Sequence, residues 1–490
     1  MRKLQIRIIV LFVLILAFVL SADAQQSPKI PETPSGKLLS YLLNAFNSGD
    51  EEQWKDFIRD HWKEEEGKFE DRFDLFMRAY RDFGGFTLHQ INNSENYSIQ
   101  VLLQTKRPRG PWYWLTFTLD ADTLPPHKLD VLRIRLAEEP GFETPEGNLS
   151  EEQIIDFLDR YLEHLVSKDR FSGTVLIAKD GKPFYTRVYG LACKRYDVPN
   201  QLDTKFNLGS MNKMFTGVAI MQLVEQGKIS LDDLVGKYLP DLPRPEIAEK
   251  VTIHHLLTHT SGMQDFWDEL DNSHWWKIRT VNQFAELIFD DTLLFEPGTD
   301  YHYSNSGPIV LGMIIEKVTG QDYYDYIREH IYKPAGMSNT DCYEMDMDVP
   351  NLAFGYTKEN YDGSVNPEGP RRNNLFLHLV KGCPAGGGFS TVEDLLKFDI
   401  ALRNNKLISK ESFEILTTGK VEIRPRWMYA FLFTDREVKG QRIVGHDGGA
   451  AGINAVLDMY LDSGFTVAAL ANYDWAIDAV REKIEKLLAR

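Results

Sequence analysis

The chain has 490 residues, of which 43% are hydrophobic, 12% aromatic and 26% charged. These fractions are ordinary for a soluble globular protein, so they exclude a disordered chain, a collagen-like chain and a bundle of membrane helices. The formal net charge is −17. A surface this acidic repels nucleic-acid phosphates and anionic lipid headgroups, so we expect neither as a partner.

Residues 1–24 have the pattern of a secretory signal peptide. Basic residues precede an unbroken apolar run at 8–20, and the tripeptide Ala-Asp-Ala at 22–24 is a small-residue cleavage site. The run of 13 residues would rise about 20 Å as a helix, which is short of the roughly 30 Å hydrocarbon core of a bilayer. The sequence therefore predicts export to the periplasm or the medium, with no membrane span after cleavage. An uncleaved anchor is the alternative.

Residues 30–138 predict a small α+β domain in which helices precede a β meander. Apolar residues recur at helical spacing from 35 to 83, and strand-like runs follow at 97–104, 112–119 and 128–136. This order of elements resembles the cone-shaped domains similar to nuclear transport factor 2, without a shared motif. Trp112, Trp114 and Phe117 could line a ligand pocket, but a role in the core is favoured.

A linker rich in Pro and Gly is expected at 139–149, and a second domain at 150–490. A capping-box pattern at 150–153 predicts that this domain begins with a helix. Strand-like runs lie near both ends of the domain, at 173–178, 183–189, 453–459 and 465–470. The first two flank Asp180-Gly181, a strong hairpin signal. The pattern predicts an α+β fold with helices on an antiparallel sheet assembled from the two ends of the domain.

Ser210 and Lys213 lie three residues apart at the start of an apolar helix that runs to 225. Residues at this spacing share one side of a helix, so the lysine would stand one turn above the serine. A serine hydroxyl is a weak nucleophile until a base takes its proton, and burial pushes a lysine toward the neutral form that can do so. Amides at the helix start would face a developing oxyanion. Alone, Ser210 would more simply be a helix cap.

Tyr303 and Asn305 lie on a predicted loop before an apolar helix at 309–318. A phenol whose pKa is lowered by a neighbouring lysine can relay a proton between a nucleophile and a leaving group. The Asn305 amide can hold both the lysine and a substrate carbonyl. Taken singly, the two residues could be a packed loop aromatic and a turn former.

A glycine-rich segment at 445–449 is expected between a strand-like run at 441–444 and a strand that starts near 453. Its glycines let the backbone approach a substrate closely. We expect the amide of Gly449 to be the second oxyanion donor, beside that of Ser210. His446 would either line this wall of the site or pack at the edge of the core.

The order Ser-x-x-Lys, Tyr-x-Asn, His-x-Gly resembles the serine β-lactamase and penicillin-binding-protein superfamily, in its class C-like branch. That branch also holds D-alanyl-D-alanine carboxypeptidases, D-aminopeptidases and esterases. The likeness covers residues 150–490 and implies a β-lactamase/transpeptidase-like antiparallel sheet flanked by helices. It implies that Ser210 is the nucleophile, Lys213 its base partner and Tyr303 the proton relay. The substrate-binding and oxyanion residues that it implies are Asn305, His446, Gly448 and Gly449. Spacing does not decide whether Lys213 or Tyr303 takes the first proton.

One departure from the superfamily bears on the substrate. Its β-lactamases usually carry Lys-Thr-Gly at the third motif, where the cation meets the carboxylate of the drug, and here the segment is His446-Asp447-Gly448. A mostly neutral imidazole beside a carboxylate is a weaker anion clamp. We therefore expect an exported serine hydrolase that forms an acyl-enzyme on an ester or a D-amino-acid peptide or amide, rather than on a β-lactam. The alternative is a non-catalytic penicillin-binding sensor or scaffold that keeps the fold.

No cofactor and no metal are expected. His255 and His259 have helical zinc-ligand spacing but lack the adjacent glutamate of the zinc motif, so packing at a helix end is the favoured role. The three cysteines, Cys193, Cys342 and Cys383, form no C-x-x-C pair and are expected to be buried thiols.

Overall fold

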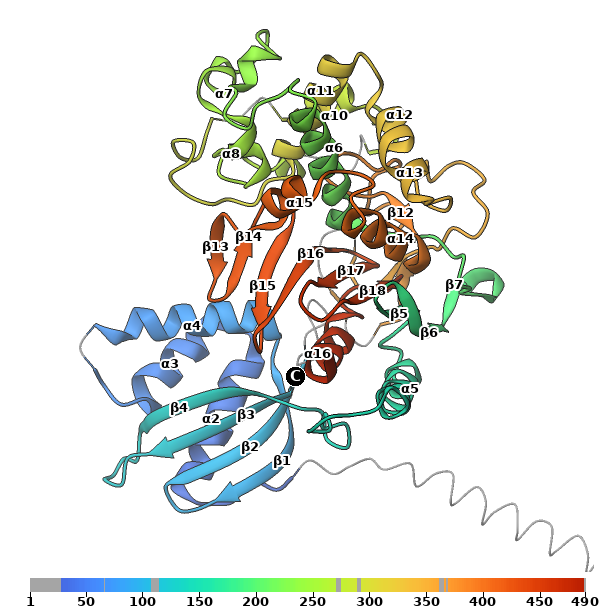
Figure 1. Ribbon diagram of the computed structural model, residues 1–490. Helices are drawn as coiled ribbons and strands as arrows, with labels where there is room; N and C mark the ends of the chain where they lie inside the picture. Colours follow the sequence, from blue (N-terminus) through green and yellow to red (C-terminus); the bar gives the residue numbers. More distant parts are fainter. Residues whose placement is uncertain are drawn as a thin grey trace, which may run out of the picture. The chain divides into compact units, whose positions relative to one another are not determined.

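The computed structural model describes residues 28–488, except for 66, 107–113, 270–274, 289–291, 361–364 and 367–368. The predicted signal peptide lies outside the described residues. The chain divides into two compact units with a boundary between Glu143 and Thr144, and their elements are labelled in Figure 1. No helix among the described residues is long and apolar enough to cross a membrane.

The first unit has, within the described residues, three helices followed by an antiparallel sheet in the order β1-β2-β3-β4. These elements are α2 (Pro34–Ser48), α3 (Glu51–His61), α4 (Lys68–Phe83), β1 (Phe86–Ser94), β2 (Ser98–Thr105), β3 (Trp114–Ala121) and β4 (Leu129–Ala137). The helices and the last three strands lie where the periodicity predicts them. The resemblance to nuclear transport factor 2 stays a prediction.

The sequence does not predict strand β1. It is an edge strand whose side chains are mostly half-buried or exposed, so its sequence shows little alternation of apolar and polar residues. Trp114 and Phe117 on β3 are 8% and 2% exposed, which confirms the core role that the sequence favours for them. Trp112 lies outside the described residues.

The second unit is built on a large sheet in the order β13-β14-β15-β16-β17-β18-β5-β6, in which every neighbouring pair is antiparallel. Its strands are β13 (Val421–Arg424), β14 (Trp427–Tyr429), β15 (Thr434–Val438), β16 (Gln441–Ala450), β17 (Ile453–Tyr460), β18 (Phe465–Ala471), β5 (Gly173–Lys179) and β6 (Lys182–Tyr189). Strand β5 from the start of the unit pairs with β18 from its end. The predicted sheet from the two ends of the domain is therefore confirmed.

The β5–β6 hairpin turns at Asp180 and Gly181, whose φ angles of 50° and 73° are both positive. Lys179 pairs with Lys182 across the turn, so the loop has two residues. Such turns match the twist of the flanking strands, and an Asp-Gly dipeptide adopts the two positive φ angles readily. The predicted hairpin is confirmed.

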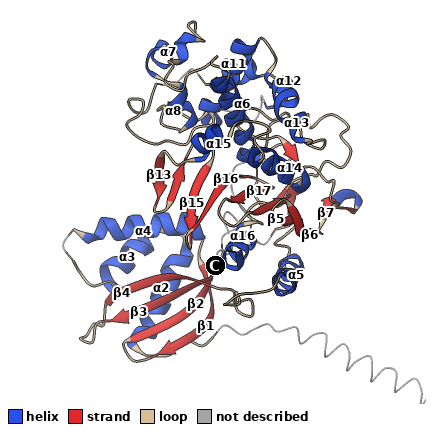
Figure 2. Ribbon diagram, in the orientation of Figure 1, coloured by secondary structure: helices blue, strands red, loops and turns tan. Residues whose placement is uncertain are grey.

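Helices cover both faces of this sheet. Leu176 and Ala178 of β5 belong to the core around α6 (Lys213–Glu225), and the alternating Val175 and Ile177 point to the opposite face. Figure 2 shows α6 on one side of the sheet, and α5 (Glu151–Ser167) and α16 (Asp478–Leu488) on the other. The other helices of this unit include α7 (Pro245–Lys250), α8 (Ile253–Leu257), α9 (Phe266–Glu269), α10 (Val281–Ala285), α11 (Ser306–Thr319), α12 (Tyr323–Ile327), α13 (Lys333–Ala335), α14 (Val392–Arg403) and α15 (Lys410–Thr417).

Helix α6 is buried all round, because every side chain from Lys213 to Leu223 is buried. Apolar residues on all sides of a helix predict such a position. A lysine on the first turn of this helix therefore has no solvent-exposed side toward which its amine could turn. Its burial is a consequence of the fold around it.

Candidate active site

Ser210 lies in a 3-10 turn, η2 (Gly209–Asn212), between β9 (Phe206–Asn207) and α6. The sequence predicts this serine at the start of the helix, and the structure places it just before. Gly209 has a φ of +51°, and a Cβ on it would lie 2.9 Å from the amide nitrogen of Gly449. Only glycine fits both constraints. The turn thus brings the Ser210 backbone against β16.

Lys213 is 0% exposed. Its Nζ lies 3.1 Å from Ser210 Oγ, 2.6 Å from Asn305 Oδ1 and 2.5 Å from the carbonyl oxygen of Ala385. Burial lowers the pKa of Lys213 to about 7. The Asn305 and Ala385 oxygens can take both hydrogens of a neutral amine. Its lone pair is then left for the hydroxyl hydrogen of Ser210.

Tyr303 approaches Ser210 from the loop before α11. Its phenol is hydrogen-bonded to the Ser210 hydroxyl, and Lys213 Nζ lies 4.9 Å from the centre of its ring. Burial raises the pKa of Tyr303 well above its usual value, and the hydrogen bond with Ser210 opposes this only in part. The prediction that the lysine lowers the pKa of this phenol is therefore wrong, because burial raises that pKa. Tyr303 keeps its proton and can donate it.

Asn305 connects the lysine to a carboxylate that the sequence did not mark. Its Oδ1 accepts from Lys213, and its Nδ2 donates to Asp265 Oδ2 at 2.8 Å. The carboxylate therefore fixes which end of the amide faces the lysine. Burial raises the pKa of Asp265. No spacing pattern could have found this residue, because its partner lies 40 positions away.

His446 lies inside strand β16, not on a loop between strands. Its side chain is 3% exposed; Nε2 is 3.0 Å from the Tyr429 hydroxyl and Nδ1 is 2.5 Å from the Asp447 carbonyl oxygen. The Asp447 carboxylate lies between His446 and Arg481, with its Oδ1 3.8 Å from His446 Nδ1 and its Oδ2 3.6 Å from Arg481 Nη1. Among the described residues, Gly449 lines the cavity at Ser210, whereas His446 and Gly448 do not. The histidine predicted to bind substrate therefore lies behind the wall.

The cavity at Ser210 has a volume of about 480 Å³. One part of its wall is apolar, with Phe266, Trp267, Leu377, Leu379 and Ile453. Glu359 adds a carboxyl group, and the described lining includes no lysine or arginine. The cavity suits a substrate with apolar groups and offers no cation to a substrate carboxylate.

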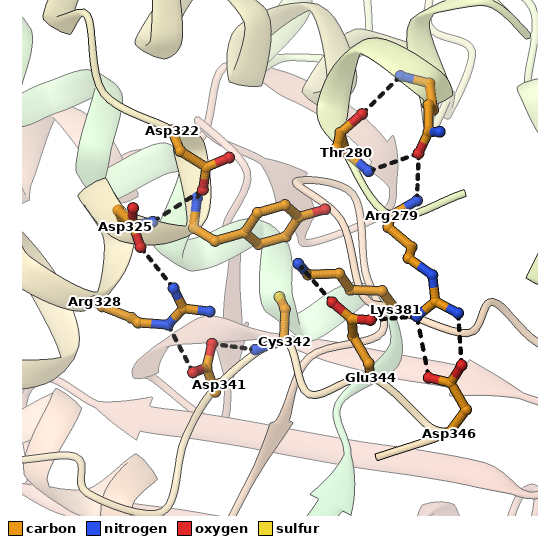
Figure 3. A network of polar contacts seen from close by, with 12 residues as sticks. Arg279, Thr280, Asp322, Asp325, Arg328, Asp341, Cys342, Glu344, Asp346 and Lys381 are labelled. Carbon is orange, nitrogen blue, oxygen red and sulfur yellow. Dashed lines mark hydrogen bonds and ion pairs between the residues drawn. The ribbon is translucent and has the colours of Figure 1, made fainter. Parts of the chain in front are cut away.

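One wall of the cavity, the segment from Cys383 to Gly387, is held by a polar network. Figure 3 shows Lys381, just before this wall, paired with Glu344, which also binds Arg279. Lys381 Nζ lies 3.2 Å from Glu344 Oε1, and Arg279 Nη2 lies 2.6 Å from Asp346 Oδ2. These ion pairs tie the wall to the segment before α10.

The two glycines of the third motif have different surroundings. Strand β15 pairs with β16 as far as Gly445, and beyond this point the same edge of β16 faces the η2 turn. A Cβ on Gly448 would lie 1.9 Å from the Leu208 carbonyl oxygen and 2.9 Å from the Ser210 nitrogen. A Cβ on Gly449 would have Ile453 O, at 3.9 Å, as its nearest neighbour. Glycine is thus required at 448 to bring β16 against the nucleophile turn.

The family model described as Beta-lactamase matches residues 158–488, more than half of the chain. The chain belongs to the beta-lactamase family. This membership confirms the resemblance and the fold class that the sequence predicts.

Its relatives include penicillin-binding proteins and an amidohydrolase. A penicillin-binding protein of Bacillus subtilis (strain 168) is 32% identical over 335 residues, which make up 64% of this chain and 71% of that protein. A penicillin-binding protein structure from Bacillus halodurans has a TM-score of 0.59 at 31% identity and covers 66% of this chain and 98% of that one. A D-stereospecific amidohydrolase from Streptomyces has a TM-score of 0.57 at 28% identity, covering 68% and 97%. These neighbours support a hydrolase of the serine type.

In this family member, the sequence-predicted residues fall into two sets. Ser210, Lys213, Tyr303, Asn305 and Gly449 are brought together at the cavity. His446 and Gly448 support it from behind. All three cysteines are buried and unpaired, as expected, and Cys383 lines the cavity. His255 accepts a hydrogen bond from the Thr252 amide at the start of α8, which confirms its packing role at a helix end.

Gly448→Ala is expected to lower kcat by about 10²-fold or more, because the added methyl forces β16 and the nucleophile turn apart. Gly440→Ala, in the turn just before β16, is the control: a Cβ there meets no atom within 4 Å and the residue is not part of the cavity lining, so kcat should stay near that of the wild type. Steady-state kinetics on both variants, with thermal unfolding to verify the fold, would measure this. Equal kcat values for the two folded variants would contradict the requirement for glycine at 448.

Proposed function

We propose that the chain is an exported serine hydrolase that forms an acyl-enzyme on Ser210. The observation that carries the proposal is the fully buried Lys213 amine 3.1 Å from Ser210 Oγ, with its two hydrogens directed to other oxygens. A neutral amine in this place can take the hydroxyl proton as the oxygen attacks a carbonyl. Export rests on the signal-peptide pattern at 1–24.

In acylation, the Ser210 oxygen bonds to the substrate carbonyl carbon and its proton passes to Lys213. The developing oxyanion lies between the amides of Ser210 and Gly449; losing one such donor typically costs about 10²–10³-fold in rate. Tyr303, whose high pKa keeps it protonated, gives its proton to the leaving group and regains one from Lys213. Water then attacks the acyl carbon by the same steps in reverse and releases the acid.

The substrate that we propose is an ester or a D-amino-acid peptide or amide. The described lining of the cavity supports this choice, because it holds Glu359 and apolar side chains but no lysine or arginine at the third-motif wall. A β-lactam carries a carboxylate that this wall cannot neutralise. The likeness to a D-stereospecific amidohydrolase, at 28% identity, is consistent with such substrates.

A panel of three substrate classes tests the proposal. Short p-nitrophenyl esters, D-alanine-ended peptides with D-amino-acid amides, and a chromogenic cephalosporin are compared by kcat/KM with the mature chain. We expect an ester or a D-amino-acid substrate to exceed the cephalosporin by about tenfold or more. If the cephalosporin is turned over fastest, the substrate assignment is wrong. If the cephalosporin binds covalently and no member of the panel is turned over, the chain is a sensor and not a hydrolase.

A further inference from the structure

Three buried side chains behind the cavity form a continuous hydrogen-bonded network. The Tyr429 hydroxyl lies 2.9 Å from His259 Nε2 on one side and 3.0 Å from His446 Nε2 on the other. The three side chains are 1%, 2% and 3% exposed in the order His259, Tyr429, His446. We call them the His-Tyr-His network.

The first end of the network fixes the position of one proton. The amide of Ser304, next to Tyr303, donates to His259 Nδ1 at 3.3 Å. Because this nitrogen accepts, a neutral His259 must carry its hydrogen on Nε2. His259 therefore donates to the Tyr429 hydroxyl.

The second end fixes the same direction independently. His446 Nδ1 lies 2.5 Å from the Asp447 carbonyl oxygen, which can only accept. A neutral His446 therefore carries its hydrogen on Nδ1 and leaves Nε2 to accept from Tyr429. Every hydrogen in the network has one acceptor, from the Tyr303 loop to strand β16.

The network packs directly against the phenol of the site. The ring centres of His259 and Tyr303 are 4.3 Å apart, and the Tyr429 ring is nearly perpendicular to that of Tyr303, at 89° and 6.2 Å. One end of the network thus contacts the Tyr303 loop by a ring face and a backbone hydrogen bond. The other end is on the strand that carries Gly449.

We propose that His259, Tyr429 and His446 are positioning residues that hold the Tyr303 phenol at its place against Ser210, by linking the Tyr303 loop to β16 through a one-directional hydrogen-bond network. The inference rests on the proposed function for its effect on rate. The direction of the network itself does not depend on that function.

A second proton on either imidazole would break the network. On His446 it would direct a second N–H group at the Tyr429 oxygen and leave the tyrosine hydrogen without its acceptor. On His259 it would place a hydrogen on Nδ1, facing the Ser304 N–H that this nitrogen accepts. Burial also lowers the pKa of both imidazoles, that of His446 to about 4. The titratable or charged groups that face the network are Lys213, Tyr301, His302, Tyr303, Asp447 and Arg481. Both histidines should therefore be neutral at the pH at which Lys213 becomes neutral.

The direction of the network is tested by nitrogen-15 NMR of the full mature chain with labelled histidine. His259→Gln and His446→Gln each remove one set of signals and so assign the two residues among the 12 histidines. We expect His259 as the Nε2–H tautomer and His446 as the Nδ1–H tautomer, both neutral from pH 6 to 8. Two like tautomers, or a charged imidazole in this range, would overturn the inference.

The effect of the His-Tyr-His network on the reaction is tested by Tyr429→Phe, which keeps the ring and removes the hydroxyl. We expect kcat to fall about 10–100-fold, because a small displacement of a proton donor is costly, with little change in KM. Tyr460→Phe is the matched control, since the Tyr460 hydroxyl is buried and makes no hydrogen bond within the described part of the chain. His446→Gln keeps an oxygen that can accept from Tyr429 and should retain more kcat than His446→Leu.

The outcomes separate the inference from the proposed function. Equal kcat values for Tyr429→Phe and Tyr460→Phe would show that the network does not position Tyr303. A wild-type chain that turns over no substrate would refute the proposed function, and with it the effect on rate. The NMR tautomers would still decide whether the hydrogen bonds run in one direction from His259 through Tyr429 to His446.

Discussion

A fluorophosphonate probe is expected to add to Ser210 of the wild-type chain and to leave Ser210→Ala unmodified. Ser210 is the serine whose hydroxyl meets a buried amine and a protonated phenol, so its oxygen is the one activated for attack on phosphorus. Hydrolysis by Ser210→Ala should fall by about 10⁴-fold or more, because no covalent intermediate can form. Intact mass and the mass of the Ser210 peptide measure the adduct, and substrate turnover measures the rate.

Ser230→Ala is the control for this experiment. Ser230 is exposed and follows the far end of α6, so its removal should change neither labelling nor rate. An adduct on a peptide that does not contain Ser210, or no adduct on folded wild-type chain, would refute the nucleophile assignment.

The parts of the site that sequence predicts well are those set by local pattern. Ser210 and Lys213 are three residues apart at the start of a helix with apolar side chains all round. That composition alone predicts that the lysine is buried. The hairpin at Asp180-Gly181 follows from backbone preferences of two residues. In each case the deciding contacts lie close in sequence or follow from burial.

The orientation of His446 could not be predicted in this way. Glycines on both sides suggest a loop, but the segment continues β16 because each residue pairs with β17, for example Gly448 with Ala455. In a strand, a shift of one position moves a side chain to the other face. His446 is consequently buried, whereas the Asp447 side chain is half exposed and lies between His446 and Arg481, which no spacing rule predicts.

Electrostatics at Tyr303 and Asn305 also needed the tertiary structure. The sign of the pKa shift at Tyr303 depends on how much solvent the phenol loses, and the effect of burial outweighs that of the hydrogen bond with Ser210. Asp265 orients Asn305 across 40 positions of sequence. Both effects come from packing between distant segments, and the residue types alone leave their direction open.

The pH dependence of kcat/KM should rise with pH and level off above about 7, because Lys213 accepts the Ser210 proton only in its neutral form. Burial lowers the pKa of Lys213 to about 7, so below this pH the amine is protonated and activity should fall about tenfold per pH unit. If Tyr303 were the base, activity would rise only in strongly alkaline solution, since burial raises the pKa of that phenol. A profile from pH 5 to 10 on an ester distinguishes the two bases.

Two substitutions of Lys213 identify the group that titrates. Lys213→Arg keeps a cation that stays protonated, and Lys213→Met removes the cation. Both variants should lower kcat/KM by about 10³-fold or more, and both should abolish the rise of kcat/KM near pH 7 (the limb of the pH profile). A limb that persists in Lys213→Met would belong to another group. His446 does not fit that role, because burial lowers its pKa to about 4, well below the limb expected for the lysine. The pH at which kcat/KM levels off therefore measures how far burial lowers the pKa of Lys213.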